Sequence, residues 1–288
     1  MCYILTRQVL IYKTCTLRHI AETHRMALRS TAAMPPAAMM RRRSATVLLD
    51  FDGVVLRHSR ASDLIRHRCE RYVANMTGCH PDSTSARELN RALYTTYGHT
   101  SYGLYRLGYS ASRQRFESYV YGSIDYDAML SDVGMSHDAT MRELHALCEH
   151  HDTYIYSNAP LAWCSEVMKR LPRPVLRQQQ QQLGRNRALQ FPEIAPGLRI
   201  LQTPYLKPDV RAYEDIETML SPIKYGRDVE KIYFVEDSFA NIAPVLRRPR
   251  WRSMLFTDST FSLPNGVTLV DSLSCVKQHV DHDSSFDG

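Results

Sequence analysis

Short hydrophobic runs that end in polar turns recur along the chain and predict buried parallel strands. The first is Val47–Leu49, which stops at Asp50. Four later runs have the same character, at Tyr154–Tyr156, Leu198–Leu201, Ile232–Val235 and Met254–Phe256. Helical stretches separate most of these runs, and strands that alternate with helices form an open parallel sheet with helices on both faces. The predicted fold class is therefore α/β, with a doubly wound parallel sheet.

About 90 residues between the first two runs show no strand pattern but repeated helix signals. One predicted helix begins at Ser62 and closes at Gly78, and a second begins with a capping box at Ser85 and closes at Gly98. A third begins at Ser112 and closes at Gly122. This helical insertion directly follows the turn at Asp50, so we expect it to cover that turn.

The pattern divides the chain into a leader, a core, an insertion and a tail. The core is predicted at 46–56 and 146–275, the helical insertion at 57–145, the leader at 1–45 and the tail at 276–288. The tail is polar and acidic, and we expect it to be frayed. Its acids and histidines could otherwise bind a stray metal ion (His279, Asp281, His282 and Asp283). The segment Gln178–Gln182 is interpreted as a surface loop insertion.

The positive net charge of +6 belongs to the leader, which has eight Lys and Arg residues against one acid. A nucleic-acid-binding domain would carry a basic stripe on its folded part, so we expect no nucleic-acid partner. The leader has the composition of an organelle transit peptide and equally that of a disordered extension. No uncharged apolar run approaches the ~20 residues that span a bilayer. We therefore expect a soluble cytoplasmic protein without a membrane partner, or a mitochondrial or other organellar one if residues 1–45 are a transit peptide.

Seven cysteines are spread along the chain without a C-x-x-C pair. An odd number at such wide spacing predicts neither a disulfide framework nor a zinc module, and a reducing compartment fits best.

Acidic residues follow the first predicted strand in a pattern that suits phosphoryl transfer. Asp50 lies at the tip of the strand, and Asp52 follows two residues later. One carboxylate can take a phosphoryl group and pass it to water, while a second acid protonates the departing oxygen and then deprotonates that water. Taken alone, D-x-D-G also describes an ordinary capped turn.

Further polar residues follow the other predicted strands, at the edge where open α/β sheets bind ligands. Ser157 and Asn158 are candidate phosphate-binding residues, although an ordinary helix N-cap would have the same pattern. Lys207, before another helix, could neutralise a nucleophile and a phosphoryl group. The acids Glu236 and Asp237 do not help to bury a strand, so they favour a cation site, and oxygen ligands beside a phosphate point to Mg²⁺.

Taken in order, four segments resemble the motifs of the haloacid dehalogenase-like hydrolase superfamily: Asp50-Phe51-Asp52-Gly53-Val54, Ser157-Asn158, Lys207-Pro208 and Glu236-Asp237-Ser238. The resemblance covers roughly 46–256. It implies a Rossmann-like core of strand order 5-4-1-2-3, a type 1 cap at the insertion, and magnesium-dependent phosphoryl transfer through an aspartyl-phosphate.

The resemblance also implies a role for each motif residue. Asp50 would be the nucleophile and Asp52 the general acid and base, with Ser157 and Lys207 binding phosphate. Asp50, the Asp52 carbonyl and Asp237 would bind the metal ion with help from Glu236.

A narrower resemblance concerns the insertion and the substrate. Its segment from Tyr97 to Leu104, with Gly98, Thr100 and Gly103, is similar to the Y-G-x-T-x-x-G-L pattern of the pyrimidine 5′-nucleotidase branch. We interpret Tyr97 to Gly103 as a glycine-bounded loop, with Tyr97, His99 and Thr100 as candidate substrate contacts. The first motif departs from that branch, because Gly53-Val54-Val55 replaces its usual N-T-L.

The sequence thus predicts a Mg²⁺-dependent phosphatase that hydrolyses a small phosphorylated metabolite, best fitted by a pyrimidine nucleoside 5′-monophosphate. Alternatives are a sugar-phosphate or phosphoglycolate phosphatase, and a catalytically inactive binding or regulatory protein built on the same fold. Dehalogenation is disfavoured because it needs no leaving-group acid, whereas Asp52 is present.

Overall fold

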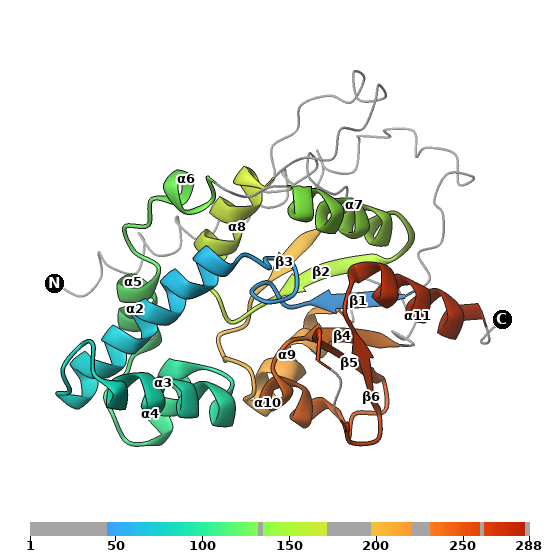
Figure 1. The fold of residues 1–288 in the computed structure, drawn as a ribbon. Helices are drawn as coiled ribbons and strands as arrows, with labels where there is room; N and C mark the ends of the chain where they lie inside the picture. Colours follow the sequence, from blue (N-terminus) through green and yellow to red (C-terminus); the bar gives the residue numbers. More distant parts are fainter. Residues whose placement is uncertain (1–44, 132–134, 172–196, 221–230, 260–261, 286–288) are drawn as a thin grey trace, which may run out of the picture. The chain divides into compact units, whose positions relative to one another are not determined.

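The computed structural model describes residues 45–131, 135–171, 197–220, 231–259 and 262–285, all within one compact unit that spans 43–288. A six-stranded parallel sheet runs through this unit (Figure 1). Its strands are β1 (Thr46–Leu49), β2 (Asp152–Tyr156), β3 (Arg199–Leu201), β4 (Ile232–Glu236), β5 (Trp251–Phe256) and β6 (Val267–Val270). Residues 1–44 of the leader and Gln178–Gln182 lie outside the described residues.

The strands lie in the order β3-β2-β1-β4-β5-β6, and every neighbouring pair is parallel. Strands β1 to β5 lie in the expected order 5-4-1-2-3 when the sheet is read from β5 to β3. All five predicted strands are present, and β1 is central, with Leu49 paired to Ile155 on one side and Val235 on the other. The sixth strand was not predicted, because only four residues at the sheet edge form it and most of them are half-buried.

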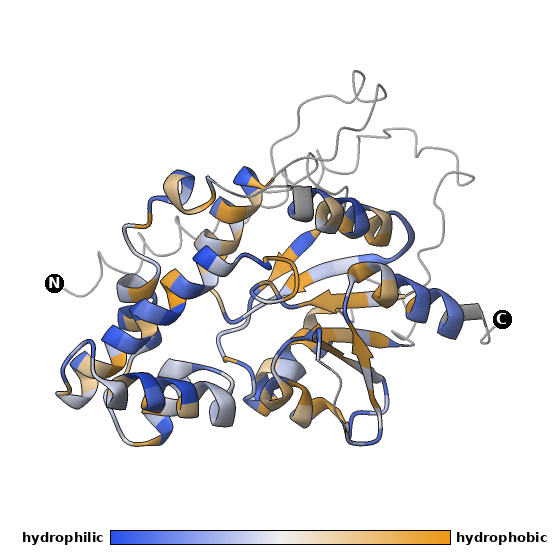
Figure 2. Ribbon diagram, viewed as in Figure 1, coloured by the Kyte–Doolittle hydropathy of each residue, from blue (hydrophilic) through white to orange (hydrophobic). Residues whose placement is uncertain are grey.

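Hydrophobic residues cover both faces of the sheet, which explains the continuous apolar runs. In β1, Val47 and Leu49 face one core and Leu48 faces the other. The first core is completed by α7 (Met135–His150), α8 (Leu161–Arg170) and α11 (Leu273–Ser285). The second is completed by α9 (Val210–Leu220), α10 (Phe239–Ile242) and the 3-10 turn Ala243–Val245. Figure 2 shows the strands as predominantly hydrophobic and the outer faces of α7 and α11 as hydrophilic. The predicted α/β class is confirmed.

The insertion forms a helical cap with a hydrophobic core of its own. Its helices are α2 (Ser59–Thr77), α3 (Thr84–Tyr97), α4 (Thr100–Arg106) and α5 (Arg113–Val120). They pack around the buried side chains Cys69, Tyr72, Val73, Leu93, Leu104, Phe116 and Val120. Helices α2 and α3 end at Gly78 and Gly98 as predicted, in left-handed backbone conformations that favour glycine. Their starts differ from the prediction, because His58 rather than Ser62 caps α2 and Ser83 rather than Ser85 caps α3.

The glycine-bounded loop predicted from Tyr97 to Gly103 is wrong in its second half, where Thr100 begins α4. Gly103 does not break this helix. A Cβ at Gly103 would lie 2.7 Å from Leu93 Cδ2 and 2.9 Å from Tyr97 Cδ2. The glycine is therefore required for the close approach of α4 to α3, rather than for a turn.

The insertion and the tail end differently from the prediction. The boundary at 145 falls inside α7, which buries Met141, Leu144 and Leu147 in the sheet core after the short helix α6 (Tyr126–Met129). The tail is helical through Ser285 because Leu273, Val276 and Val280 recur at helical spacing and are buried.

The acids of α11 bond to neighbouring side chains. Asp281 accepts a hydrogen bond from Lys277 and pairs with His151, and Asp283 accepts from Tyr233. A frayed tail is therefore contradicted for residues 276–285.

Within the described part of the chain, every helix is too short or too polar to cross a membrane.

Candidate active site

The carboxyl ends of three neighbouring strands bring the predicted site residues together. Asp50 follows β1, Ser157 follows β2, and Glu236 is the last residue of β4. Because β1 lies between β2 and β4 in a parallel sheet, all three residues lie at the same edge. The Asp50 amide continues the ladder by donating to the Val235 carbonyl at 2.9 Å. The sheet therefore places Asp50 at the centre of the site.

A tight turn after β1 positions Asp52 beyond Asp50. The amides of Val55 and Leu56 both donate to the Phe51 carbonyl, at 3.0 and 2.8 Å. Gly53 has φ +89°, and a Cβ there would lie 2.1 Å from Asp237 Oδ2. A glycine is thus required both by the backbone conformation and by the close approach of the Asp237 carboxylate.

A buried ammonium group connects the acids of the site. Lys207 is 1% exposed, and its Nζ donates to Asp50 Oδ1 at 3.0 Å, Glu236 Oε2 at 2.5 Å and the Tyr156 carbonyl at 3.0 Å. Burial alone would lower the pKa of Lys207, but the charges of Asp50 and Glu236 outweigh it and raise the pKa above its ordinary value. Lys207 therefore stays protonated and holds the two carboxylates in place.

Asn158 fixes the backbone that carries this lysine. Its Nδ2 donates to the Lys207 carbonyl at 2.9 Å, and its Oδ1 accepts from the Lys207 amide at 2.8 Å. Both ends of the Asn158 amide are therefore engaged within the protein. The structure places this predicted phosphate-binding residue as a support for Lys207, 49 positions further along the chain.

Ser157 lies beside the same cluster with its hydroxyl oriented by the backbone. The Ala159 amide donates to Ser157 Oγ at 3.2 Å, and the residue is buried. Because Oγ acts there as an acceptor, its own hydrogen can be donated to an oxygen of a ligand.

Trp163 of α8 contacts Asp52 and was not predicted from the sequence. Its Nε1 donates to Asp52 Oδ1 at 3.1 Å, and the indole ring is 1% exposed. Burial, followed by the charge of Asp50, raises the pKa of Asp52 to about 7, while the Trp163 hydrogen bond opposes the rise. A carboxyl group with such a pKa can both donate and accept a proton near neutral pH.

Three carboxylates meet at a point that suits a divalent cation. Oxygen atoms of Asp50, Glu236 and Asp237 lie within 4.8 Å of one another. Lys207 is the cation paired with Asp50 and Glu236 among the described residues. Burial, followed by the charge of Asp50, raises the pKa of Glu236 and raises that of Asp237 to about 7, so a further cation at this point would favour the ionised form of both. Carboxylate oxygens are hard ligands of the kind that Mg²⁺ prefers. These residues therefore fit the predicted ion.

A cavity of about 570 Å³ opens between this cluster and the cap. The core contributes Asp50, Asp52, Ser157, Lys207 and Asp237 to its wall, among other residues. The cap contributes polar and aromatic side chains from α2 and α3 and from the start of α4, among them Glu70, Asn90, Tyr94, His99 and Thr100. Of the predicted cap contacts, His99 and Thr100 line the cavity. Tyr97 is not part of its wall and packs against the hydrophobic core of the cap instead.

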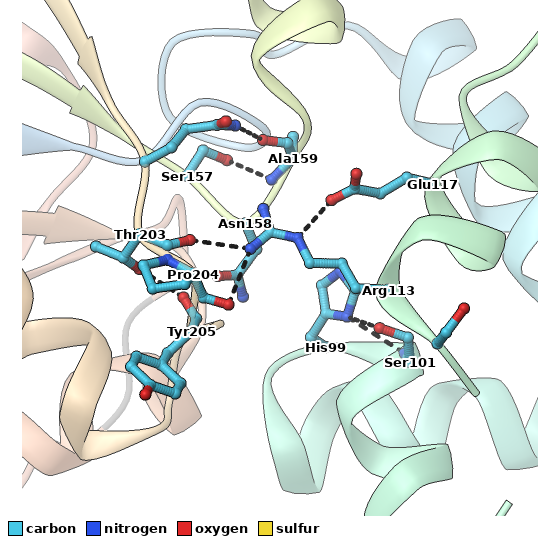
Figure 3. A network of polar contacts seen from close by, with 12 residues as sticks. His99, Ser101, Arg113, Glu117, Ser157, Asn158, Ala159, Thr203, Pro204 and Tyr205 are labelled. Carbon is cyan, nitrogen blue, oxygen red and sulfur yellow. Dashed lines mark hydrogen bonds and ion pairs between the residues drawn. The ribbon is translucent and has the colours of Figure 1, made fainter. Parts of the chain in front are cut away.

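Arg113 of α5 connects the cap to the core loop that leads to Lys207. Its Nη1 donates to the Thr203 carbonyl at 3.0 Å and to the Pro204 carbonyl at 3.5 Å, while its Nε donates to Glu117 at 2.5 Å (Figure 3). This link holds the cap against the core and was not predicted from the sequence.

Comparison with solved structures gives matches over most of the chain. A haloacid dehalogenase-like hydrolase from Burkholderia xenovorans is 17% identical, covers 84% of this chain and 98% of its own, and has a TM-score of 0.42. A phosphatase of the same superfamily from Thermococcus onnurineus is 12% identical, with coverage of 82% and 97% and a TM-score of 0.43. A dehalogenase is 12% identical, with coverage of 82% and 96% and a TM-score of 0.40.

The structural neighbours are haloacid dehalogenase-like hydrolases. No protein-family model and no curated protein matches the sequence. The neighbours include both a phosphatase and a dehalogenase.

The carboxylate cluster predicts Mg²⁺ binding that depends on Asp237. We expect Asp237→Asn to weaken Mg²⁺ binding about tenfold or more, measured by isothermal titration calorimetry, because a charged oxygen ligand is lost. Asp258→Asn is the matched control, since that carboxylate is exposed and paired with Arg57 outside the cavity. Equal affinities of wild type and Asp237→Asn would exclude Asp237 from the metal site.

Proposed function

We propose that this protein is a Mg²⁺-dependent phosphatase that hydrolyses a phosphate monoester through an aspartyl-phosphate on Asp50. The observation that carries the proposal is the 3.0 Å bond from the buried Lys207 ammonium to Asp50 Oδ1, at the floor of a cavity that Asp52 also lines. A nucleophilic carboxylate, an acid with a pKa near neutrality and a fixed positive charge are the groups that this reaction needs.

In the first step a carboxylate oxygen of Asp50 attacks phosphorus. A bond forms between that oxygen and phosphorus while the bond from phosphorus to the leaving oxygen breaks. Asp52 gives its proton to the leaving oxygen, and Trp163 keeps the Asp52 carboxyl group in place by donating to Oδ1. Lys207 and the Ser157 hydroxyl stabilise the negative charge of the transferring group.

In the second step water attacks the phosphorus of the aspartyl-phosphate. Asp52, now ionised, accepts the proton from this water, and the bond between Asp50 and phosphorus breaks. Inorganic phosphate leaves, Asp50 is again a carboxylate, and Asp52 is again protonated. One residue thus supplies the proton in the first step and removes one in the second.

Asp50, Glu236 and Asp237, with the backbone carbonyl of Asp52, would hold Mg²⁺ when it is bound. The ion supplies further positive charge to the phosphate oxygens and to the nucleophile.

The cavity supports a nucleoside 5′-monophosphate as the substrate. A volume of about 570 Å³ lies within the usual range for small-molecule sites. Tyr94, Phe116 and Tyr121 line the cavity; Tyr94 is 44% exposed, whereas Phe116 is 1% exposed and packs in the core of the cap. Exposed ring faces can stack on a nucleobase, which contributes ~1 to 3 kcal/mol per base in sites of that kind. The aromatic lining favours a nucleotide, and the resemblance of Tyr97 to Leu104 to the pyrimidine 5′-nucleotidase pattern favours a pyrimidine base.

A sugar-phosphate or phosphoglycolate phosphatase is the second candidate. Arg66, Arg87 and Arg91 of the cap line the same cavity, and a substrate with a second anionic group could pair with them. Arg66 is already paired with Asp63 and Glu70, which leaves Arg87 and Arg91 as the relevant cations. Arg87 and Arg91 are exposed to solvent, which weakens an ion pair with a ligand. The two arginines therefore support a sugar phosphate less strongly than the aromatic lining residues support a nucleotide.

Phosphate release from a substrate panel tests the proposed reaction. With Mg²⁺ the purified protein should release phosphate from UMP and CMP faster than from sugar phosphates or phosphoglycolate, and EDTA should abolish release. Asp50→Asn should lower the rate about a thousandfold or more while keeping the fold, because the amide can still accept from Lys207 but is a poor nucleophile. Wild-type activity in Asp50→Asn would exclude Asp50 as the nucleophile. A fully inactive wild type would favour the regulatory alternative.

The pH dependence follows from the raised pKa of Asp52, which is about 7. Leaving-group protonation needs the acid form, so kcat/KM for UMP should fall as the pH rises through about 7. Trp163→Phe removes a hydrogen bond that stabilises the ionised form, so the pKa should rise and this fall should move to higher pH. If the fall in kcat/KM at high pH occurs at the same pH in Trp163→Phe as in the wild type, Trp163 does not stabilise the ionised form of Asp52.

A further inference from the structure

Asn90 of α3 lines the cavity, and a hydrogen bond within the cap holds its amide oxygen. Thr100 Oγ1 donates to Asn90 Oδ1 at 2.8 Å, and both side chains are buried. Because Oδ1 is occupied, Nδ2 is the end of the amide left for a ligand. Among the residues that the structure describes, none makes a hydrogen bond to Nδ2. Asn90 therefore offers donors, and Thr100 acts as the residue that positions it.

His99, the N-cap of α4, is fixed in a similar way. The Ser101 amide donates to its Nδ1 at 3.2 Å, and Ser101 Oγ lies 2.9 Å from the same nitrogen (Figure 3). Since Nδ1 accepts, the proton of the neutral ring lies on Nε2. Burial and the nearby charge of Arg113 lower the pKa of His99 to about 3, so the ring stays neutral at physiological pH. No hydrogen bond to Nε2 is found in the described part of the chain.

The two donors belong to one wall of the cavity. His99 and Asn90 both line it, and Thr100 joins them by following His99 in the chain and bonding to Asn90. Neither Nδ2 of Asn90 nor the protonated Nε2 of His99 can accept a hydrogen bond. A ligand that covers these donors without offering them acceptors would leave them unsatisfied, so this wall favours a ligand group that presents acceptors.

We propose that Asn90 and His99 are specificity-determining residues that donate hydrogen bonds to carbonyl oxygens of a pyrimidine base. The inference rests on the proposed nucleotidase function and deepens it. Uracil and cytosine present carbonyl oxygens to these donors, whereas the acceptors of adenine are ring nitrogens at other positions of a larger base. Donors placed for these carbonyl oxygens therefore favour UMP and CMP over AMP by the position of the acceptors, while the core carries out the same reaction on any monoester that fits.

Two substitutions remove one donor each and keep the local structure. Asn90→Asp retains an oxygen that accepts from Thr100 but loses the amide hydrogens. His99→Asn retains an N-cap oxygen for the Ser101 amide but loses the ring nitrogen that can reach the ligand. Asn75→Asp is the matched control, because Asn75 belongs to the cap but bonds to Tyr119 outside the cavity.

The measurement is kcat/KM of the full chain for UMP, AMP and phenyl phosphate, whose leaving group carries no carbonyl oxygen. In both variants the ratio of UMP to phenyl phosphate should fall about tenfold or more, and the preference for UMP over AMP should shrink. In Asn75→Asp both ratios should stay as in the wild type. Circular dichroism checks that each variant is folded.

The other outcomes separate two failures. In one outcome the wild type hydrolyses UMP while the variants keep its ratio of kcat/KM for UMP to that for phenyl phosphate. In that case Asn90 and His99 do not recognise the base, and this inference is overturned while the proposed function stands. An equal loss on both substrates would also overturn it, because such a loss would show a structural role. If the wild type hydrolyses phenyl phosphate but no nucleotide, the proposed substrate class fails and this inference fails with it.

Discussion

The site depends on a lysine ammonium group buried among carboxylates. An isolated charge in a protein interior is very costly, and removal of one partner from a buried ion pair typically costs about 3 to 5 kcal/mol. The buried charge of Lys207 is therefore stable only beside Asp50 and Glu236, and the two buried carboxylates in turn require its positive charge. The pairs connect the tip of β1, the end of β4 and the loop that precedes α9. Asn158, which lies just after β2, connects that strand to the same cluster through its hydrogen bonds to the Lys207 backbone. One side chain thus fixes the position of Asp50, the proposed nucleophile, relative to Glu236, a second candidate metal ligand.

Core and cap have different roles in the proposed reaction. The core positions Asp50, Asp52 and Lys207, which are the groups for transfer of a phosphoryl group from any suitable ester. The cap contributes the donor wall at Asn90 and His99, which concerns only the leaving group. Arg113 connects the two parts through the carbonyls of Thr203 and Pro204, four and three residues before Lys207. Contact of the cap with the loop that carries the lysine places both parts of the site around one cavity.

The sequence was sufficient to predict residues at strand ends. Asp50, Ser157 and Glu236 follow or end hydrophobic runs, and a parallel sheet must bring such positions to one edge. Trp163 could not be predicted in the same way, because its partner Asp52 lies 111 positions away and only the packing of α8 makes them neighbours. Asn90 was missed for a similar reason, since its role follows from a bond between two helices. Gly103 and Val280 misled the prediction because a glycine in a helix and an apolar residue in a polar tail acquire meaning only through their packing.

Formation of a covalent phosphoryl group on Asp50 is the central claim, and it can be measured by trapping. In Asp52→Asn the residue that would activate water is lost. With acetyl phosphate, whose leaving group needs no proton, the first step should still proceed and the second should be slow. Mass spectrometry of the acid-quenched protein should then find one phosphoryl group on the peptide that contains Asp50, and none in a variant that also carries Asp50→Asn. Turnover of acetyl phosphate without any phosphorylated Asp50 would contradict the proposed mechanism.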